Sequence, residues 1–206
     1  MKFNFRDFIL FLKTIHIRIR LLKAGKSIFI DPSSQFGFPN KIILNDHVHI
    51  SMGVKVTANS NQEPPIEVDS NSFIGEYSIL SANRGSIKIG KNTFINSHCV
   101  LHGNGDILIG DYVALAPYCM ISSVAHPFSS TDIPITEQPN KAAPIEIEDD
   151  VWLGAGAKVM QGFPYKKITI GKGTVISAGS IVTKSIPEYS IVTGNPAKII
   201  ASRKKT

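Results

Sequence analysis

The sequence is poor in cysteine, in aromatic residues, in charge and in long apolar runs. It has two cysteines and one tryptophan among 206 residues, and 18% of its residues are charged. Two cysteines do not make a disulfide framework, and the apolar run Phe8 to Leu12 is too short to cross a bilayer. No secretory signal is visible. With 43% hydrophobic residues, the composition predicts a globular chain, with the cytoplasm as its default compartment.

Positive charge concentrates at the two ends of the chain, which has a net charge of +6. These cations are Arg18, Arg20, Lys23, Lys26, Lys198, Arg203, Lys204 and Lys205. They do not alternate with aromatic residues as in proteins that stack bases, so we expect no nucleic-acid partner. A phosphorylated ligand or an anionic membrane surface would use this charge equally well, and weak association with the inner face of a membrane fits it.

A repeat of six residues is the main feature of the sequence. Aliphatic residues recur at this spacing in six triplets: Leu44, Ile50, Val56; Val68, Ile74, Leu80; Ile89, Ile95, Leu101; Ile109, Leu115, Ile121; Ile147, Leu153, Val159; and Ile170, Ile176, Val182. Two positions before each stands Ile, Val or a small residue, and the position after is mostly small or polar. A spacing of six fits no helical period.

The physical meaning follows from the alternation. Residues two apart share one face of a strand, and the small residue that follows begins a turn in which Gly or Asn can adopt a positive φ. Three strands and three turns make one coil of eighteen residues, which buries its apolar face by stacking on its neighbours. The stretch Ile186 to Ile200 would cover the last coil. Cys99 and Cys119 would occupy equivalent positions on successive coils, as small buried thiols.

Departures from eighteen residues locate the loops. Successive triplets begin 24, 21, 20, 38 and 23 residues apart. The one large excess predicts an excursion over residues 122–143, which leaves the coil after Ile121. Long loops on rigid scaffolds usually carry function.

Before the coils, apolar residues recur at helical spacing, with cations off the stripe. They are Phe5, Phe8, Ile9, Leu12, Ile15, Ile19 and Leu22. The pattern predicts an amphipathic helix over residues 3–24, packed against the coils or a neighbouring subunit, or facing a membrane. We therefore divide the chain into a helix (1–26), a β-helical domain (27–200) and a basic tail (201–206).

Three stretches resemble the hexapeptide-repeat acyltransferases: APIEIEDDVWLG from Ala143, SAGSIVTK from Ser177 and IVTGNPAKII from Ile191. The most similar branch is that of galactoside, maltose and surface-polysaccharide O-acetyltransferases. The resemblance implies an all-β, left-handed parallel β-helix. It also implies acetyl-CoA as co-substrate, a sugar hydroxyl as acceptor, a role in surface-polysaccharide synthesis, and a homotrimer.

The same resemblance assigns roles to single residues. His126, in SVAHPF at the root of the excursion, matches the family's general base, and imidazole suits proton transfer at neutral pH. Asn96, thirty residues earlier, matches an asparagine that holds the developing oxyanion. Asn104 lies where that branch has an acceptor-binding aspartate, so the identity of the acceptor stays open.

The resemblance also implies a coenzyme A groove between adjacent prisms. Trp152 would form the wall of this groove. The small residues Ala155 and Ala178 would leave room for the pantetheine arm. The nucleotide and its phosphates would be held by Thr183, Lys184 and Lys198.

Two alternatives remain at this point, and a third is disfavoured. N-acetylation of a nucleotide-linked amino sugar uses the same fold, and a non-catalytic β-helical scaffold is a different class of protein. A zinc site like that of β-helical carbonic anhydrases would need histidines at another spacing than His98 and His102, so we expect no metal.

Overall fold

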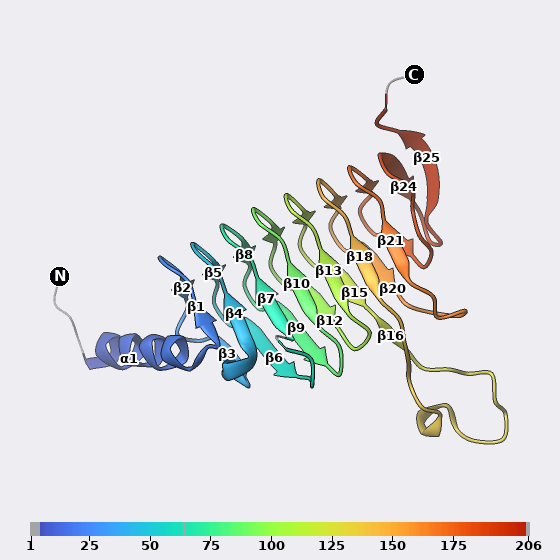
Figure 1. The fold of residues 1–206 in the computed structure, drawn as a ribbon. Helices are drawn as coiled ribbons and strands as arrows, with labels where there is room; N and C mark the ends of the chain where they lie inside the picture. Colours follow the sequence, from blue (N-terminus) through green and yellow to red (C-terminus); the bar gives the residue numbers. More distant parts are fainter. Residues whose placement is uncertain (1–4, 64, 205–206) are drawn as a thin grey trace.

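The structure, a computed structural model, describes residues 5–63 and 65–204 as a three-sided spiral of short strands (Figure 1). Each of its seven coils contributes one strand to each of three sheets, called here A, B and C. Within the coils all strand pairs are parallel, for example Ile87–Ile89 on Ile107–Ile109. The fold is thus the predicted all-β, left-handed parallel β-helix with one helix and one long excursion.

The strands follow one another around the spiral in the order A, B, C. Sheet A is β1 (Lys23–Ala24), β4 (Ile42–Leu44), β7 (Ile66–Val68), β10 (Ile87–Ile89), β13 (Ile107–Ile109), β18 (Ile145–Ile147) and β21 (Ile168–Ile170). Sheet B is β2 (Phe29–Ile30), β5 (His49–Ile50), β8 (Phe73–Ile74), β11 (Phe94–Ile95), β14 (Ala114–Leu115), β19 (Trp152–Leu153) and β22 (Val175–Ile176), extended by β24 (Ser190–Thr193) and β25 (Lys198–Ser202). Sheet C is β3 (Gln35–Gly37), β6 (Lys55–Asn59), β9 (Ile79–Asn83), β12 (Val100–His102), β15 (Met120–Ser122), β20 (Lys158–Met160) and β23 (Ile181–Val182).

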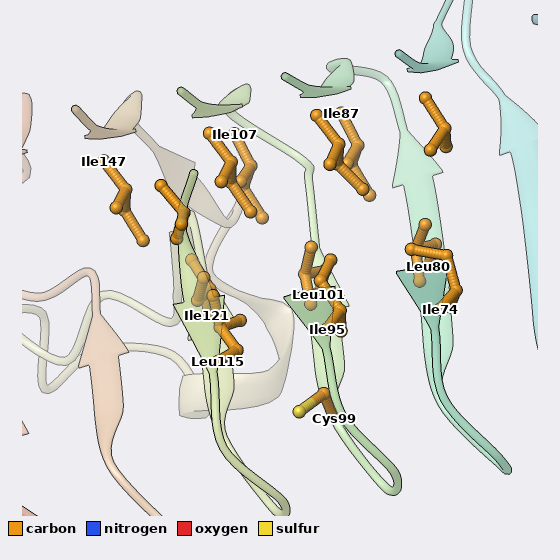
Figure 2. Packing of buried hydrophobic residues seen from close by; sticks show 14 of the residues in the cluster. Ile74, Leu80, Ile87, Ile95, Cys99, Leu101, Ile107, Leu115, Ile121 and Ile147 are labelled. Carbon is orange, nitrogen blue, oxygen red and sulfur yellow. The ribbon is translucent and has the colours of Figure 1, made fainter. Parts of the chain in front are cut away.

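The hexad residues form one continuous core along the spiral axis. All eighteen are at most 4% exposed, and the eighteen residues two positions before them are at most 3% exposed. Figure 2 shows the aliphatic side chains of successive coils next to one another along the spiral axis. Polar members of the inner set pair with backbone: the Ser72 and Thr93 hydroxyls donate to the carbonyls of Gly90 (2.7 Å) and Gly110 (2.9 Å). The predicted inward alternation is confirmed.

One coil lies before those that the triplets revealed. Ala24, Ile30 and Phe36 keep the spacing of six in β1, β2 and β3, and these strands pair with β4, β5 and β6. The helix α1 (Phe5–Arg20) therefore ends four residues before the predicted position 24, because Lys23–Ala24 already joins sheet A. Position 3 of the prediction lies outside the described residues.

The three corners of the spiral are not equivalent. At the A–B and B–C corners the residue three places after each hexad aliphatic has a positive φ, and it is often not glycine: His47, Tyr77, His98 and Tyr118 have φ between 57° and 65°. The connections from sheet C back to sheet A vary in length and include the 3₁₀ turn η1 (Pro39–Lys41) and the excursion. Every insertion therefore falls at the C–A corner, as repeat proteins confine insertions to one face.

Both ends of the spiral are covered. At the first coil, Ile17 of α1 and Leu21, which directly follows the helix, join the core, and each is 8% exposed. At the last coil, β24 pairs in parallel with β22, and β25 runs antiparallel to β24, so the stretch predicted to cover the last coil does so. None of the helices formed by the described residues has the length and hydropathy to cross a bilayer.

Candidate active site

The root of the excursion is fixed on the C–A corner. After β15, the strand β16 (Val124–Ala125) pairs antiparallel with β17 (Lys141–Ala142), so the loop leaves and returns side by side. The Ser123 hydroxyl donates to the His102 carbonyl (3.0 Å) and accepts from the Gly105 amide (2.9 Å). These bonds tie the start of the excursion to the preceding coil.

His126 follows this root directly and is exposed. Within residues 5–63 and 65–204, no hydrogen bond or ring contact engages its imidazole. The next residue, Pro127, is buried and anchors the chain. The structure thus presents an exposed imidazole on a piece of backbone that the buried Pro127 anchors.

Asn104 lies on the preceding coil at the same corner. A Cβ at the neighbouring Gly105 would come within 2.6 Å of the Ala143 amide nitrogen and 2.8 Å of the Ser123 carbonyl. The turn that carries Asn104 is therefore pressed against both ends of the excursion. The structure brings Asn104 and His126 to adjacent coils of one corner.

Asn96 lies at a different corner. It follows β11 in sheet B and precedes β12 in sheet C, so it stands at the B–C corner, one coil before the excursion. Its side chain is exposed, and its Nδ2 donates to the Leu115 carbonyl at 3.0 Å. That bond uses one of the two amide hydrogens and gives Asn96 a local role in the turn.

The B–C corner also carries the predicted small residues. Ala155 and Ala178 are exposed on successive coils, and the Gly179 amide donates to the Ala155 carbonyl at 2.9 Å. A Cβ at Gly156 or at Gly179 would meet nothing within 4 Å, so this corner is open at these two turns. Trp152 lies beside it on the outer face of sheet B, 52% exposed.

The three predicted phosphate-binding residues lie together at the last coil. Thr183, Lys184 and Lys198 line one cavity of about 210 Å³. Thr183 and Lys184 also line a neighbouring cavity of about 410 Å³ with Lys166 and Lys167. The positive charge of this surface suits an anionic group such as a phosphate.

A buried amide faces the larger cavity. Gln161 is 5% exposed, and its Nε2 donates to the carbonyls of Lys166 (2.9 Å) and Pro144 (3.3 Å). Its Oε1 has no partner among the described residues. No sequence pattern singled out Gln161, because its burial depends on the local path of residues 161–167.

Aromatic stacking accounts for two of the other histidines. His98 lies between Tyr77 and Tyr118, with ring centroids 5.4 and 5.0 Å away. His49 stacks on Phe29 at 4.5 Å. Sequence reasoning missed these columns, although the signal was present: each ring recurs at the same place on successive coils. Among the described residues no cluster of three or more His, Cys, Asp or Glu is arranged to hold a metal.

The two cysteines are free and fully buried, at the equivalent positions that the repeat predicted. The Cys119 Sγ lies 3.3 Å from the Gly154 carbonyl. Hydrogen bonding with the Cys99 thiol, together with burial, raises the pKa of Cys119 above its usual range. Burial and the raised pKa both disfavour the thiolate of Cys119, which is the nucleophilic form.

Comparison with known families bears on this arrangement. Residues 144–184 match the family model described as the hexapeptide repeat of succinyl-transferase. This segment is a hexapeptide repeat. It contains Trp152, Ala155, Ala178, Thr183 and Lys184, so most of the surface described above lies within it.

Several proteins are similar to a larger part of the chain. A probable acetyltransferase of Mycobacterium tuberculosis, Rv3034c, is 31% identical over 79% of this chain and 52% of its own length. A putative acetyltransferase of Staphylococcus aureus, SAV2555, is 39% identical over 56% of this chain and 54% of its own length. The chain thus spans about half the length of these curated relatives.

Among solved structures, AntD of Bacillus cereus superposes with a TM-score of 0.58 at 20% identity, over 90% of this chain and 85% of its own. It is an N-acyltransferase, determined in complex with dTDP and 3-hydroxybutyryl-CoA. At this identity the likeness supports the fold alone.

Proposed function

We propose that the chain is an acetyl-CoA-dependent O-acetyltransferase of the hexapeptide-repeat class, acting on a sugar hydroxyl in surface-polysaccharide synthesis in the cytoplasm. The observation that carries the proposal is the free imidazole of His126 on a fixed root beside Asn104. The similarity to named acetyltransferases supports the reaction class.

In the proposed mechanism, His126 takes the proton of the acceptor hydroxyl as that oxygen attacks the acetyl group. Bound acetyl-CoA supplies the activated thioester. Asn96 and a backbone N–H donate to the oxyanion, and protonated His126 returns its proton to the departing thiolate. The steps use no metal ion and no acyl-enzyme, in keeping with the burial of both cysteines.

The two groups of site residues favour a homotrimer. His126, Asn104 and Lys184 lie at the C–A corner, whereas Asn96, Ala155 and Ala178 lie at the B–C corner. One prism does not bring these corners together. A neighbouring copy that faces the C–A corner with its own B–C corner completes the groove, so the partner supplies Asn96.

The excursion supports such an assembly. Phe128, Ile133 and Ile135 are 66%, 43% and 53% exposed, on a loop that projects away from the prism (Figure 1). Contacts with a second copy would cover these apolar side chains.

The basic surface at the last coil supports the co-substrate. Thr183, Lys184 and Lys198 would hold the phosphates of coenzyme A, and Trp152 would wall the groove in which the pantetheine arm passes Ala155 and Ala178.

The test is a matched pair of variants, His126→Asn and His47→Asn. Both positions are exposed histidines, but only His126 is placed as the base. We expect kcat of thiol release to fall by about 10²–10⁴-fold in His126→Asn, with coenzyme A affinity unchanged, and to stay near wild type in His47→Asn. Activity of His126→Asn within tenfold of wild type contradicts the assignment.

The choice of acceptors separates the alternatives. Free sugars, nucleotide sugars and amino sugars would be compared as acceptors in the same thiol-release assay. Preference for an amino sugar linked to a nucleotide would favour N-acylation, the class of reaction of the N-acyltransferase AntD. Absence of release with every acceptor, together with no coenzyme A binding, would favour a scaffold. A monodisperse active monomer in sedimentation would contradict the trimer.

A further inference from the structure

The helix α1 has two opposite apolar faces, and the prism covers one of them. Ile17 is 8% exposed against the first coil. The other face is formed by Leu12, Ile15 and Ile19, which are spaced three and four residues apart. These side chains are 46%, 39% and 73% exposed. At about 100° per residue, Ile17 and Ile19 point to opposite sides of the helix. Leu22, just past the helix end, continues this exposed stripe at 49%.

Cations flank the stripe on both sides. Lys13 and Arg20 each follow a stripe residue by one position, whereas Arg18 precedes Ile19, so the helical period puts them on opposite flanks. From residue 12 to residue 26 the sequence has five Lys or Arg and no Asp or Glu. Arg18 donates to the Gly25 carbonyl at 3.1 Å. None of these cations forms a salt bridge with a carboxylate in the described part of the chain.

The position of α1 leaves this face accessible. The helix projects from the first coil, at the end of the spiral away from the β24–β25 hairpin (Figure 1). Single exposed apolar residues are ordinary on protein surfaces. Four of them in one stripe, rimmed by cations, form a contiguous apolar patch, and such patches mark interaction sites.

We propose that this stripe and its flanking cations dock the protein on a bilayer that contains anionic lipid. The apolar side chains would enter the boundary between headgroups and acyl chains, and the cations would meet the lipid phosphates. A second copy of α1 is a poorer partner, because it would bring the same positive charge to the contact. Docking is independent of the proposed transfer reaction, which needs neither the stripe nor the cations.

The test measures co-sedimentation of the full chain with phosphatidylcholine vesicles, with and without about 30% phosphatidylglycerol. We expect the wild type to bind the anionic vesicles at least about tenfold more tightly, and its binding to weaken as salt rises. The salt series needs no variant, so it tests the proposal even if a substitution affects folding.

Two double variants form a matched pair. In Ile15→Ser/Ile19→Ser, binding should fall about 10–100-fold, because apolar area no longer leaves water. In Ile199→Ser/Ile200→Ser, at 54% and 62% exposure on β25, binding should not change. Both should keep the wild-type melting temperature and thiol-release activity.

Lys13→Gln/Arg20→Gln should weaken binding at low salt and have little effect at high salt, where charge is screened. No wild-type binding to anionic vesicles, or equal binding by the two Ile variants, overturns the proposal. The proposal is also overturned if Ile15→Ser/Ile19→Ser sediments as a smaller oligomer than the wild type, since that result assigns the stripe to a contact between copies.

Discussion

The coils and the excursion differ in what holds their side chains. Hexad residues of the coils are at most 4% exposed, whereas Phe128 of the excursion is 66% exposed. The excursion instead relies on polar bonds, such as that from the Gln138 amide to the Ser130 carbonyl at 3.0 Å. The coils therefore fix positions, while the loop, freed from packing into the core, can present chemistry at its root.

The largest expected effect comes from removing the loop. Replacing residues 126–140 with a Gly/Ser segment of equal length should lower thiol-release activity by about 10³-fold, because the proposed base is lost. The circular dichroism spectrum should keep its β signature and the melting temperature should change little, since no hexad residue is altered. Loss of the β signature would show that the coils need the excursion in order to fold, which contradicts the independence of the coils from the loop.

The sequence predicted the coils well because their period is set by local geometry. Burial of the aliphatic residues and their partners, the single long excursion and its root at His126 all followed from spacing. The first coil escaped prediction because Ala24 and Phe36 are not aliphatic residues of the expected kind, and because Leu22 also fitted the helical stripe.

The site was predicted less completely than the fold. Spacing gave Asn96 its place after Ile95, but it could not show that the amide bonds the Leu115 carbonyl. Burial of Gln161 and the stacking of His98 between two tyrosines depend on contacts between coils, which a single hexad does not contain.

A smaller effect should come from truncating the core of the coils. Leu115→Ala removes a side chain that is fully buried, and it should lower the free energy of unfolding by about 3 kcal/mol. Leu108→Ala is the control, because Leu108 points outward on β13 and is 36% exposed; it should cost less than about 1 kcal/mol. Denaturant titration of both variants at one protein concentration measures the difference, and equal costs would refute the inward alternation.

The smallest effect concerns the thiols. Cys119→Ala should change kcat less than about twofold, because Cys119 is a buried neutral thiol and not a nucleophile. Its raised pKa keeps the proton on sulfur as pH rises. Cys99 and Cys119 are both fully buried, so reaction of the folded protein with a thiol reagent should stay slow between about pH 7 and pH 9, where a free cysteine ionises. Rapid labelling at neutral pH before unfolding would contradict the burial.

The two covered ends of the spiral have a consequence for solubility. A stack of parallel coils ends in unpaired backbone, which is a template for another molecule to continue the ladder. The helix at the first coil occupies one such end. At the other, β25 reverses the strand direction beyond β24, so a second spiral meets an antiparallel strand where a parallel one would be needed. The terminal elements therefore act as caps that oppose the end-to-end growth of fibres.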